Sequence, residues 1–339
     1  MLPGVLVAQR SIEIGGGDGN RSDDRLLTTT TMVLGFCVLL SSLLAARRHS
    51  EDGHTTATTN TLPECVGIRA SDRFPTVVTR LAQQLNSPVV DSQRRQRRQP
   101  QQTDPSSEIS HILSVEPWDD STSDDAYAIG ISHVNSAKTN KPFIVDYCPS
   151  RTGSRLGQRA AQGNDLLLQA IGSHQQSIVD ATAGWGADAW IMAQSRSSHV
   201  VHMVERNPIV ATLVQDALRR FPDTDPVKER LFLTVGDFCN LPTTTTIVDS
   251  PDVVYLDPMF PPRKKKALVK KNMQMLHSLL SSQDEGDVDH TDLFAAAMCS
   301  ATARVVVKRP IHAAWLVADA KPSFAVTGPT SRWDVYLVQ

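Results

Sequence analysis

Predicted strands and helices alternate along residues 177–310, and this alternation limits the possible folds more than any other feature of the chain. Apolar, β-branched runs predict strands over 177–184, 199–205, 231–237, 251–257 and 304–310. Helical patterns lie between them, over 188–195, from the Asn207–Pro208 cap onward, over about 264–280 and over 291–303. This order requires an α/β fold with a doubly wound, mostly parallel sheet. The segments "FAVTG" and "RWDVYLV" add a predicted antiparallel hairpin at the C-terminal end.

The first 62 residues do not have the pattern of a folded domain and predict a disordered leader. Within it, "MVLGFCVLLSSLLAA" (32–46) is apolar and is followed by two arginines. The run is shorter than the roughly 18 residues of a confident membrane span, and has about the length of a leader's apolar core. A leader whose translation starts at Met32 and a short membrane anchor both remain open. The compartment is open as well: cytoplasm, plastid or mitochondrion.

Residues 63–142 predict a small α/β subdomain that precedes the main domain of 143–339. A helix-like pattern in "FPTVVTRLAQQLNSPVV" ends near Asn86, and "AYAIGISHV" and "KPFIVDYC" predict strands. Between the helix and the first of these strands, 91–108 is a low-complexity polar segment with four arginines. We therefore expect a disordered insert over about 91–125. In the main domain, "GNDLLLQAIG" predicts a short helix that stops at Gly172.

The overall charge and the cysteines exclude some classes of protein. The formal net charge is −2, so any contact with nucleic acid must come from local basic patches. The five cysteines are widely spaced, without a C-x-x-C pair. Neither a zinc site nor a disulfide framework is expected, and no metal is predicted.

A glycine turn, "DATAGWGADAW", follows the strand over 177–184. Gly184, Gly186 and Ala189 fit the loose G-x-G-x-x-G/A pattern of nucleotide-binding turns, and Glu205 ends the next strand, where an acid accepts hydrogen bonds from ribose hydroxyls. NAD enzymes and S-adenosylmethionine enzymes share this geometry. Asp180 and Asp188 flank the turn and favour the cationic S-adenosylmethionine over a pyrophosphate, although both acids could simply cap the turn and the helix.

A second motif, Asp257-Pro258-Met259-Phe260, follows the strand over 251–257. It fits the [D/N]-P-x-[F/Y] pattern of methyltransferases that act on planar nitrogens. Asp257 and the Pro258 carbonyl can accept the hydrogens of an exocyclic amine, which localises the lone pair on its nitrogen. Phe260 can stack on the base. A plain turn would explain the Asp-Pro pair alone, but not together with the glycine turn.

Basic residues follow this motif and also lie at the end of the last parallel strand. Such cations oppose the dipole at the start of a helix, so contact with a phosphate backbone is a better explanation than helix stability. A solvated helix face is the alternative. The candidate RNA contacts are Lys264, Lys265, Lys266, Lys308 and Arg309.

Together, "DATAGWGADAW", "MVERNPIVATLVQDAL", "VVYLDPMFPPRKKKALVKK", "RVVVKRP" and "RWDVYLV" resemble bacterial small-subunit ribosomal RNA guanine-N2 methyltransferases of the RsmJ type. The resemblance covers about 143–338 and is weaker over 63–142. It implies a Rossmann-like, class I fold, S-adenosylmethionine as cofactor, and methylation of the N2 amine of one guanosine in small-subunit rRNA. By position it implies cofactor contacts at Ala187, Asp188, Glu205, Arg206, Asp237, Phe238 and Asp257.

The chain departs from the family pattern at some of these positions. The family usually has arginine where Ala187 stands, and two small polar residues where Asp237 and Phe238 stand. Here Asp237 would lie beside the adenine N6 and Phe238 against the ring. Arg151, Arg155 and Arg159, in a Gly-rich loop, are further candidates for contacts with RNA or the cofactor loop.

Other functions remain possible from the residues alone. The substrate nitrogen could be adenine N6 or a protein glutamine amide. A protein that binds S-adenosylmethionine or RNA without turnover is a third class, although no catalytic position is broken. An NAD(P) oxidoreductase is disfavoured by the acids around the glycine turn.

Overall fold

The computed structural model of the chain falls into two units, Met1–Ala57 and Thr58–Gln339. The structure describes residues 66–90, 109–119, 122–134, 141–147, 165–196, 199–241, 250–259, 275–276, 279 and 290–338, all within the second unit. The predicted leader, with its apolar run over 32–46, lies outside these residues. Within the described parts, no helix is both long enough and apolar enough to span a membrane.

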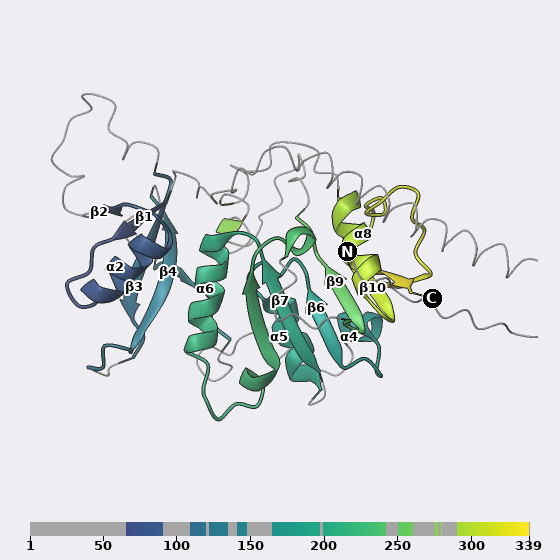
Figure 1. Cartoon of the computed structure of the whole chain (residues 1–339), viewed down its shortest axis with the longest axis horizontal. Helices are drawn as coiled ribbons and strands as arrows, with labels where there is room; N and C mark the ends of the chain where they lie inside the picture. Colours follow the sequence, from purple (N-terminus) through teal and green to yellow (C-terminus); the bar gives the residue numbers. More distant parts are fainter. Residues whose placement is uncertain are drawn as a thin grey trace, which may run out of the picture. The chain divides into compact units, whose positions relative to one another are not determined.

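The larger of two sheets has seven strands in the order β11-β12-β10-β9-β6-β7-β8. All neighbours pair in parallel except β12, which is antiparallel to both β10 and β11. Figure 1 shows its central strands β7, β6 and β9. The order confirms the predicted Rossmann-like methyltransferase sheet with a C-terminal antiparallel hairpin. Its strands are β6 (Ser177–Asp180), β7 (Val200–Glu205), β8 (Leu231–Val235), β9 (Val253–Leu256), β10 (Arg304–Pro310), β11 (Phe324–Thr327) and β12 (Ser331–Leu337).

The helices of this domain begin and end where local signals place them. Asn207 caps α6 (Pro208–Arg219), because its side chain accepts hydrogen bonds from the N–H groups of Ile209 and Val210 at 3.0 and 3.1 Å. Gly172 ends α4 with φ +92°, as predicted. The other elements are α4 (Leu166–Ile171), α5 (Ala187–Ser195), α8 (Thr291–Ser300) and the 3₁₀ turns η3 (Lys228–Arg230) and η4 (Phe238–Asn240).

A smaller sheet of five strands, in the order β2-β1-β3-β4-β5, carries one helix. The elements are β1 (Val66–Arg69), α2 (Pro75–Gln84), β2 (Val89–Val90), β3 (His111–Pro117), β4 (Tyr127–His133) and β5 (Phe143–Ile144). The helix and the strand at "AYAIGISHV" agree with the sequence patterns.

Two boundaries differ from the sequence-based prediction. Residues 111–117, which we expected within the disordered insert, form β3 between β1 and β4. The strand contains polar residues, and two of them, His111 and Ser114, are buried, so its composition resembled that of a loop. In addition, β5 pairs with β4 of the smaller sheet, so that sheet extends past the predicted boundary at 142.

Asp216 connects α6, a helix of the larger domain, to the smaller sheet. Its side chain is buried and accepts hydrogen bonds from the Ile129 N–H of β4 at 2.9 Å and from Arg220 Nε at 2.8 Å, while Arg219 binds its other oxygen at 2.9 Å. Arg220 also donates to the carbonyl of Val145, and the Arg219 guanidinium lies 3.8 Å from the centre of the Tyr127 ring. One carboxylate therefore organises the contact between α6 and the smaller sheet.

Candidate active site

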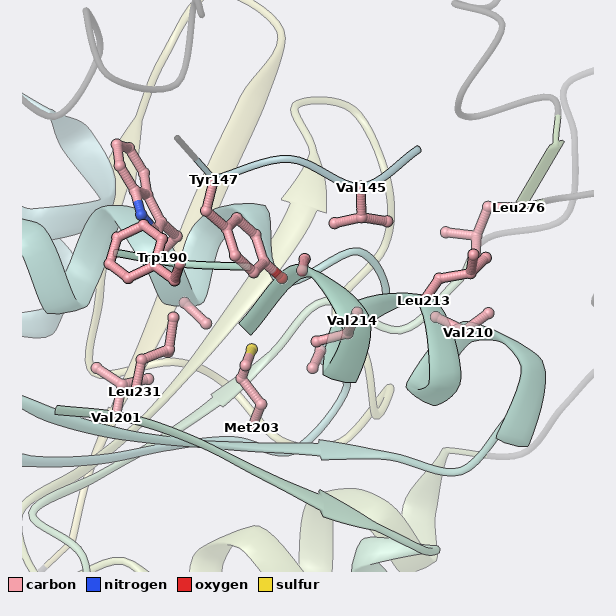
Figure 2. Packing of buried hydrophobic residues seen from close by; sticks show 14 of the residues in the cluster. Val145, Tyr147, Trp190, Val201, Met203, Val210, Leu213, Val214, Leu231 and Leu276 are labelled. Atoms are coloured by element: carbon pink, nitrogen blue, oxygen red, sulfur yellow. The ribbon is translucent and has the colours of Figure 1, made fainter. Parts of the chain in front are cut away.

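The glycine turn between β6 and α5 depends on the two predicted glycines. Gly184 and Gly186 have φ values of +51° and +67°, which disfavour other residues. A Cβ atom on Gly186 would lie 2.2 Å from the Tyr147 hydroxyl oxygen and 2.8 Å from the Met203 sulfur. Figure 2 shows Tyr147 and Met203 among the buried side chains of this region. The turn is therefore packed closely against Tyr147 and Met203 at Gly186.

Tyr147 was not predicted as part of the site. Its hydroxyl donates to the Trp185 carbonyl in the middle of the turn, at 2.8 Å. It comes from the segment just after β5, and the Phe143 ring of β5 lies 5.0 Å from the Trp185 ring. The only signal in the sequence was that "KPFIVDY" fits the family pattern, and no local rule indicates that this tyrosine reaches the turn.

Glu205 ends β7 beside the glycine turn, as predicted. Its carboxylate accepts hydrogen bonds from the N–H groups of Gly184 at 2.8 Å and Asn207 at 2.7 Å. Burial raises the pKa of Glu205 to about 7, and these two N–H groups act in the opposite direction. The backbone thus fixes the orientation of an acid at the place where Rossmann-like folds bind a ribose.

We expect the affinity for S-adenosylmethionine to fall as the pH drops below about 7. The ionised Glu205 can accept ribose hydroxyl donors, whereas the protonated acid loses an acceptor. One required deprotonation makes the affinity fall about tenfold per pH unit. Calorimetric titration between about pH 8 and about pH 6 measures this. Glu205→Gln should bind more weakly at pH 8 and depend less on pH; superimposable profiles would contradict the assignment.

Arg206 and the Asp237–Phe238 pair lie next to Glu205. Arg206 directly follows Glu205 and is exposed. The N–H of Gly236 donates to the Glu205 carbonyl at 2.9 Å, which brings the end of β8 to this position. Asp237 caps η4, accepting from the Cys239 N–H and the Asn240 side chain, both at 3.1 Å. The predicted adenine contacts therefore lie after the end of β8, beside Glu205, and the Asp237 carboxylate is bound within its own turn.

Three carboxylates meet at the carboxyl ends of β6 and β9 and at the start of α5. Asp180 is buried, and its pKa lies well above the usual range because of burial and the nearby charges of Asp188 and Asp257. Asp188 is not the cap of α5, because Gly186 occupies that position. Its carboxylate instead accepts from the Tyr255 hydroxyl and from Lys308 Nζ, both at 2.7 Å. This concentration of negative charge suits a cationic ligand better than a pyrophosphate.

The Asp257-Pro258 motif is attached directly to the glycine turn. The N–H of Asp257 donates to the Thr182 hydroxyl at 2.6 Å, and the carboxylate of Asp257 accepts from Lys308 Nζ at 2.8 Å. Pro258 is buried. The two motifs recognised separately in the sequence thus form one site. Thr182 and Tyr255 were missed, although Tyr255 lies on β9 only two positions before Asp257, and in extended chain residues two apart share a face.

The structure places the basic residues that we predicted as RNA contacts in different surroundings. Lys308 pairs with Asp188 and Asp257 rather than projecting freely from the sheet edge. Arg309 is buried and donates to the Ala314 carbonyl at 2.9 Å, so it supports the loop after β10 and is not presented to RNA. Phe260 and six candidate contacts lie outside the described residues. The six are Arg151, Arg155, Arg159, Lys264, Lys265 and Lys266. Across the described ranges, no group of three or more potential ligands could hold a metal ion.

Comparison with known proteins agrees with this geometry. A family model described as "Putative SAM-dependent methyltransferase" matches residues 123–338. The crystal structure of a SAM-dependent methyltransferase from Neisseria gonorrhoeae superposes with a TM-score of 0.53 and 26% identity, over 80% of this chain and 95% of that one.

Three similar proteins are each called ribosomal RNA small subunit methyltransferase J. The protein of Aeromonas hydrophila is 44% identical over 190 residues, covering 55% of this chain and 71% of its own length. That of Dechloromonas aromatica is 38% identical over 201 residues, 58% and 78% of the two chains. That of Hydrogenovibrio crunogenus is 32% identical over 267 residues, 76% and 90% of the two chains.

Proposed function

Because the chain belongs to the ribosomal RNA small subunit methyltransferase J family, we propose that it methylates the exocyclic N2 amine of a guanosine in small-subunit rRNA. Its cofactor is S-adenosylmethionine. The observation that carries the proposal is the hydrogen bond from the Asp257 N–H to the Thr182 hydroxyl, at 2.6 Å. It holds the amine-binding motif against the glycine turn, so a bound amine and the cofactor would meet.

The residues around the glycine turn fit this cofactor. Gly184 and Gly186 give the turn the left-handed backbone that it needs, and two backbone N–H groups hold the Glu205 carboxylate beside it, where Rossmann-like folds bind a ribose. Asp188 supplies negative charge beside the turn, and a cationic ligand would favour ionisation of Asp180, whose pKa is raised by burial and by its acidic neighbours. When bound, S-adenosylmethionine supplies an electrophilic methyl group on its sulfonium, which becomes a neutral thioether once the methyl group is transferred.

The chain itself acts on the amine. The carboxylate of Asp257 accepts one N–H, and the Pro258 carbonyl is proposed to accept the other, so the nitrogen lone pair is available for the new N–C bond. After the bond forms, the nitrogen carries one hydrogen too many, and Asp257 is the adjacent group that can take the proton. Such positioning can be worth about 7–11 kcal/mol of the barrier. Phe260 is proposed to stack on the base.

The basic residues outside the described ranges remain proposed RNA contacts. Lys264, Lys265 and Lys266 follow the Asp257-Pro258 motif, and Arg151 and Arg155 precede α4. A net charge of −2 makes such a local patch necessary for phosphate binding. Lys308 and Arg309 are not proposed as RNA contacts, because their side chains donate hydrogen bonds to groups of the protein itself.

The purified chain should transfer tritiated methyl groups from S-adenosylmethionine to small-subunit rRNA or the small ribosomal subunit. Digestion of the product and mass spectrometry of the nucleosides should yield N2-methylguanosine. N6-methyladenosine, or label in ribosomal protein, would assign the chemistry to another planar nitrogen. Tight binding of the cofactor without transfer to any component would contradict the enzymatic proposal.

A further inference from the structure

Lys308, on β10, makes two contacts that the proposed mechanism has not yet used. Its Nζ lies 2.7 Å from Asp188 Oδ2 and 2.8 Å from Asp257 Oδ2. One ammonium group therefore joins three separate elements: α5, the segment after β9, and β10. Lys308 thus links Asp257, the residue that would accept the amine hydrogen, to the Asp188 carboxylate beside the cofactor turn.

Strand pairing places Lys308 at this position. Val307 pairs with Leu256 in the parallel register of β10 and β9, so Lys308 and Asp257 are the next residues along the two chain segments, Asp257 directly after the end of β9. The Lys308 side chain is only 23% exposed. A lysine whose ammonium is held by two carboxylates is poorly placed for a phosphate backbone, so a role within the site explains it better.

The groups that face Asp257 make a cation necessary. Asp188 on α5 raises the pKa of Asp257, and Asp257 in turn raises the pKa values of Asp180 on β6 and Tyr255 on β9. On β12, which pairs with β10, Arg332 is paired with Asp334 at 2.7 Å. Burial raises the pKa of Asp257, Lys308 opposes this increase, and Asp188 adds to it. Removal of Lys308 would leave neighbouring negative charges without this compensation.

The contacts also fix the direction of the Asp257 carboxylate. The hydrogen bond from Lys308 Nζ goes to Oδ2 of Asp257, and the backbone N–H of Asp257 donates to the Thr182 hydroxyl. Among the described residues, no partner binds Oδ1, and the side chain is partly exposed. One oxygen is therefore anchored while the other can receive a donor from the substrate.

We propose that Lys308 is a positioning residue for the methyl transfer: it keeps the Asp257 carboxylate charged and anchored through Oδ2, so that Oδ1 can accept the substrate amine. This inference rests on the proposed function. Lys308 contacts neither the reacting nitrogen nor the methyl group in this scheme, and acts through Asp257.

The test compares Lys308→Met with Lys308→Arg in the full chain at saturating S-adenosylmethionine. Loss of an opposite charge at this distance raises a carboxyl pKa by about 1–3 units. In Lys308→Met, the acidic limb of the kcat profile should therefore move to higher pH by about that amount, with activity partly restored at about pH 9. Lys308→Arg should keep a profile close to that of the unaltered protein.

Asp188→Asn provides the opposite change. It removes a negative neighbour of Asp257 and keeps Lys308, so the acidic limb should move to lower pH. General damage to the fold cannot shift the two profiles in opposite directions. A loss that is equal at every pH, or a raised KM for rRNA with unchanged kcat, would overturn the proposal; the second result would restore the RNA contact predicted from the sequence.

A measurement without substrate tests this proposal separately from the proposed function. It can also be made on a variant that has lost activity. The ¹³C carboxyl resonance of Asp257, assigned by its disappearance in Asp257→Asn, should titrate at a higher pH in Lys308→Met than in the unaltered chain. An unchanged titration would overturn the role of Lys308. If this shift is observed but the unaltered chain methylates no rRNA, the proposed function fails while the pairing of Lys308 with Asp257 stands.

Discussion

Replacement of Asp257 by alanine is expected to reduce methyl transfer to small-subunit rRNA by about 10²- to 10⁴-fold, the usual contribution of a positioned acid or base. The variant loses the acceptor that localises the amine lone pair and the nearby acceptor for its proton. Lys308 keeps Asp188 as a partner, so no isolated buried cation results. Single-turnover rates with bound cofactor measure the effect on chemistry alone.

Asp257→Asn is the matched control for shape. It keeps the size and one carbonyl oxygen but loses the charge, so its activity should lie between those of the unaltered chain and the alanine variant. Calorimetry and thermal unfolding should show that both variants fold. Full activity in the folded alanine variant would disprove the catalytic assignment of this residue.

Replacement of Asp216 by alanine is expected to lower the free energy of unfolding by about 3–5 kcal/mol, because removal of one partner of a buried ion pair leaves the other uncompensated. Asp216 is 3% exposed and binds Arg219, Arg220 and the Ile129 N–H together. The Arg220 side chain is buried as well. Chemical denaturation of the purified variant and of the unaltered chain measures this difference in the free energy of unfolding.

Asp223 offers a matched surface control. It also pairs with a basic side chain, that of Lys228, but its own side chain is 92% exposed. Asp223→Ala should leave the free energy of unfolding nearly unchanged, since exposed ion pairs contribute little. If the two alanine variants lose similar stability, burial is not what makes the Asp216 contacts important.

The main sheet could be predicted from the sequence because each strand is a short apolar run with a polar residue or turn at its end. Gly172 and Asn207 ended and began helices where their chemistry requires. The two motifs of the site were also recognisable, since strand ends in a parallel sheet meet at one edge.

The remaining features depended on packing that no local pattern records. Lys308 and Arg309 are adjacent basic residues, yet one pairs with the site's carboxylates and the other with a loop carbonyl. Alternation along a strand predicts that the two side chains point to opposite faces, but it does not predict which groups they contact. Strand β3 was missed because its buried His111 and Ser114 are polar.

The position of Tyr147 bears on where this protein can be divided. Its hydroxyl holds the Trp185 carbonyl and fills the space beside Gly186, although it belongs to the segment that leads out of the smaller sheet. A truncated chain that starts after residue 147 would retain every strand of the larger sheet but leave the cofactor turn without its underlying support. The smallest autonomous enzyme must therefore begin upstream of its own catalytic sheet.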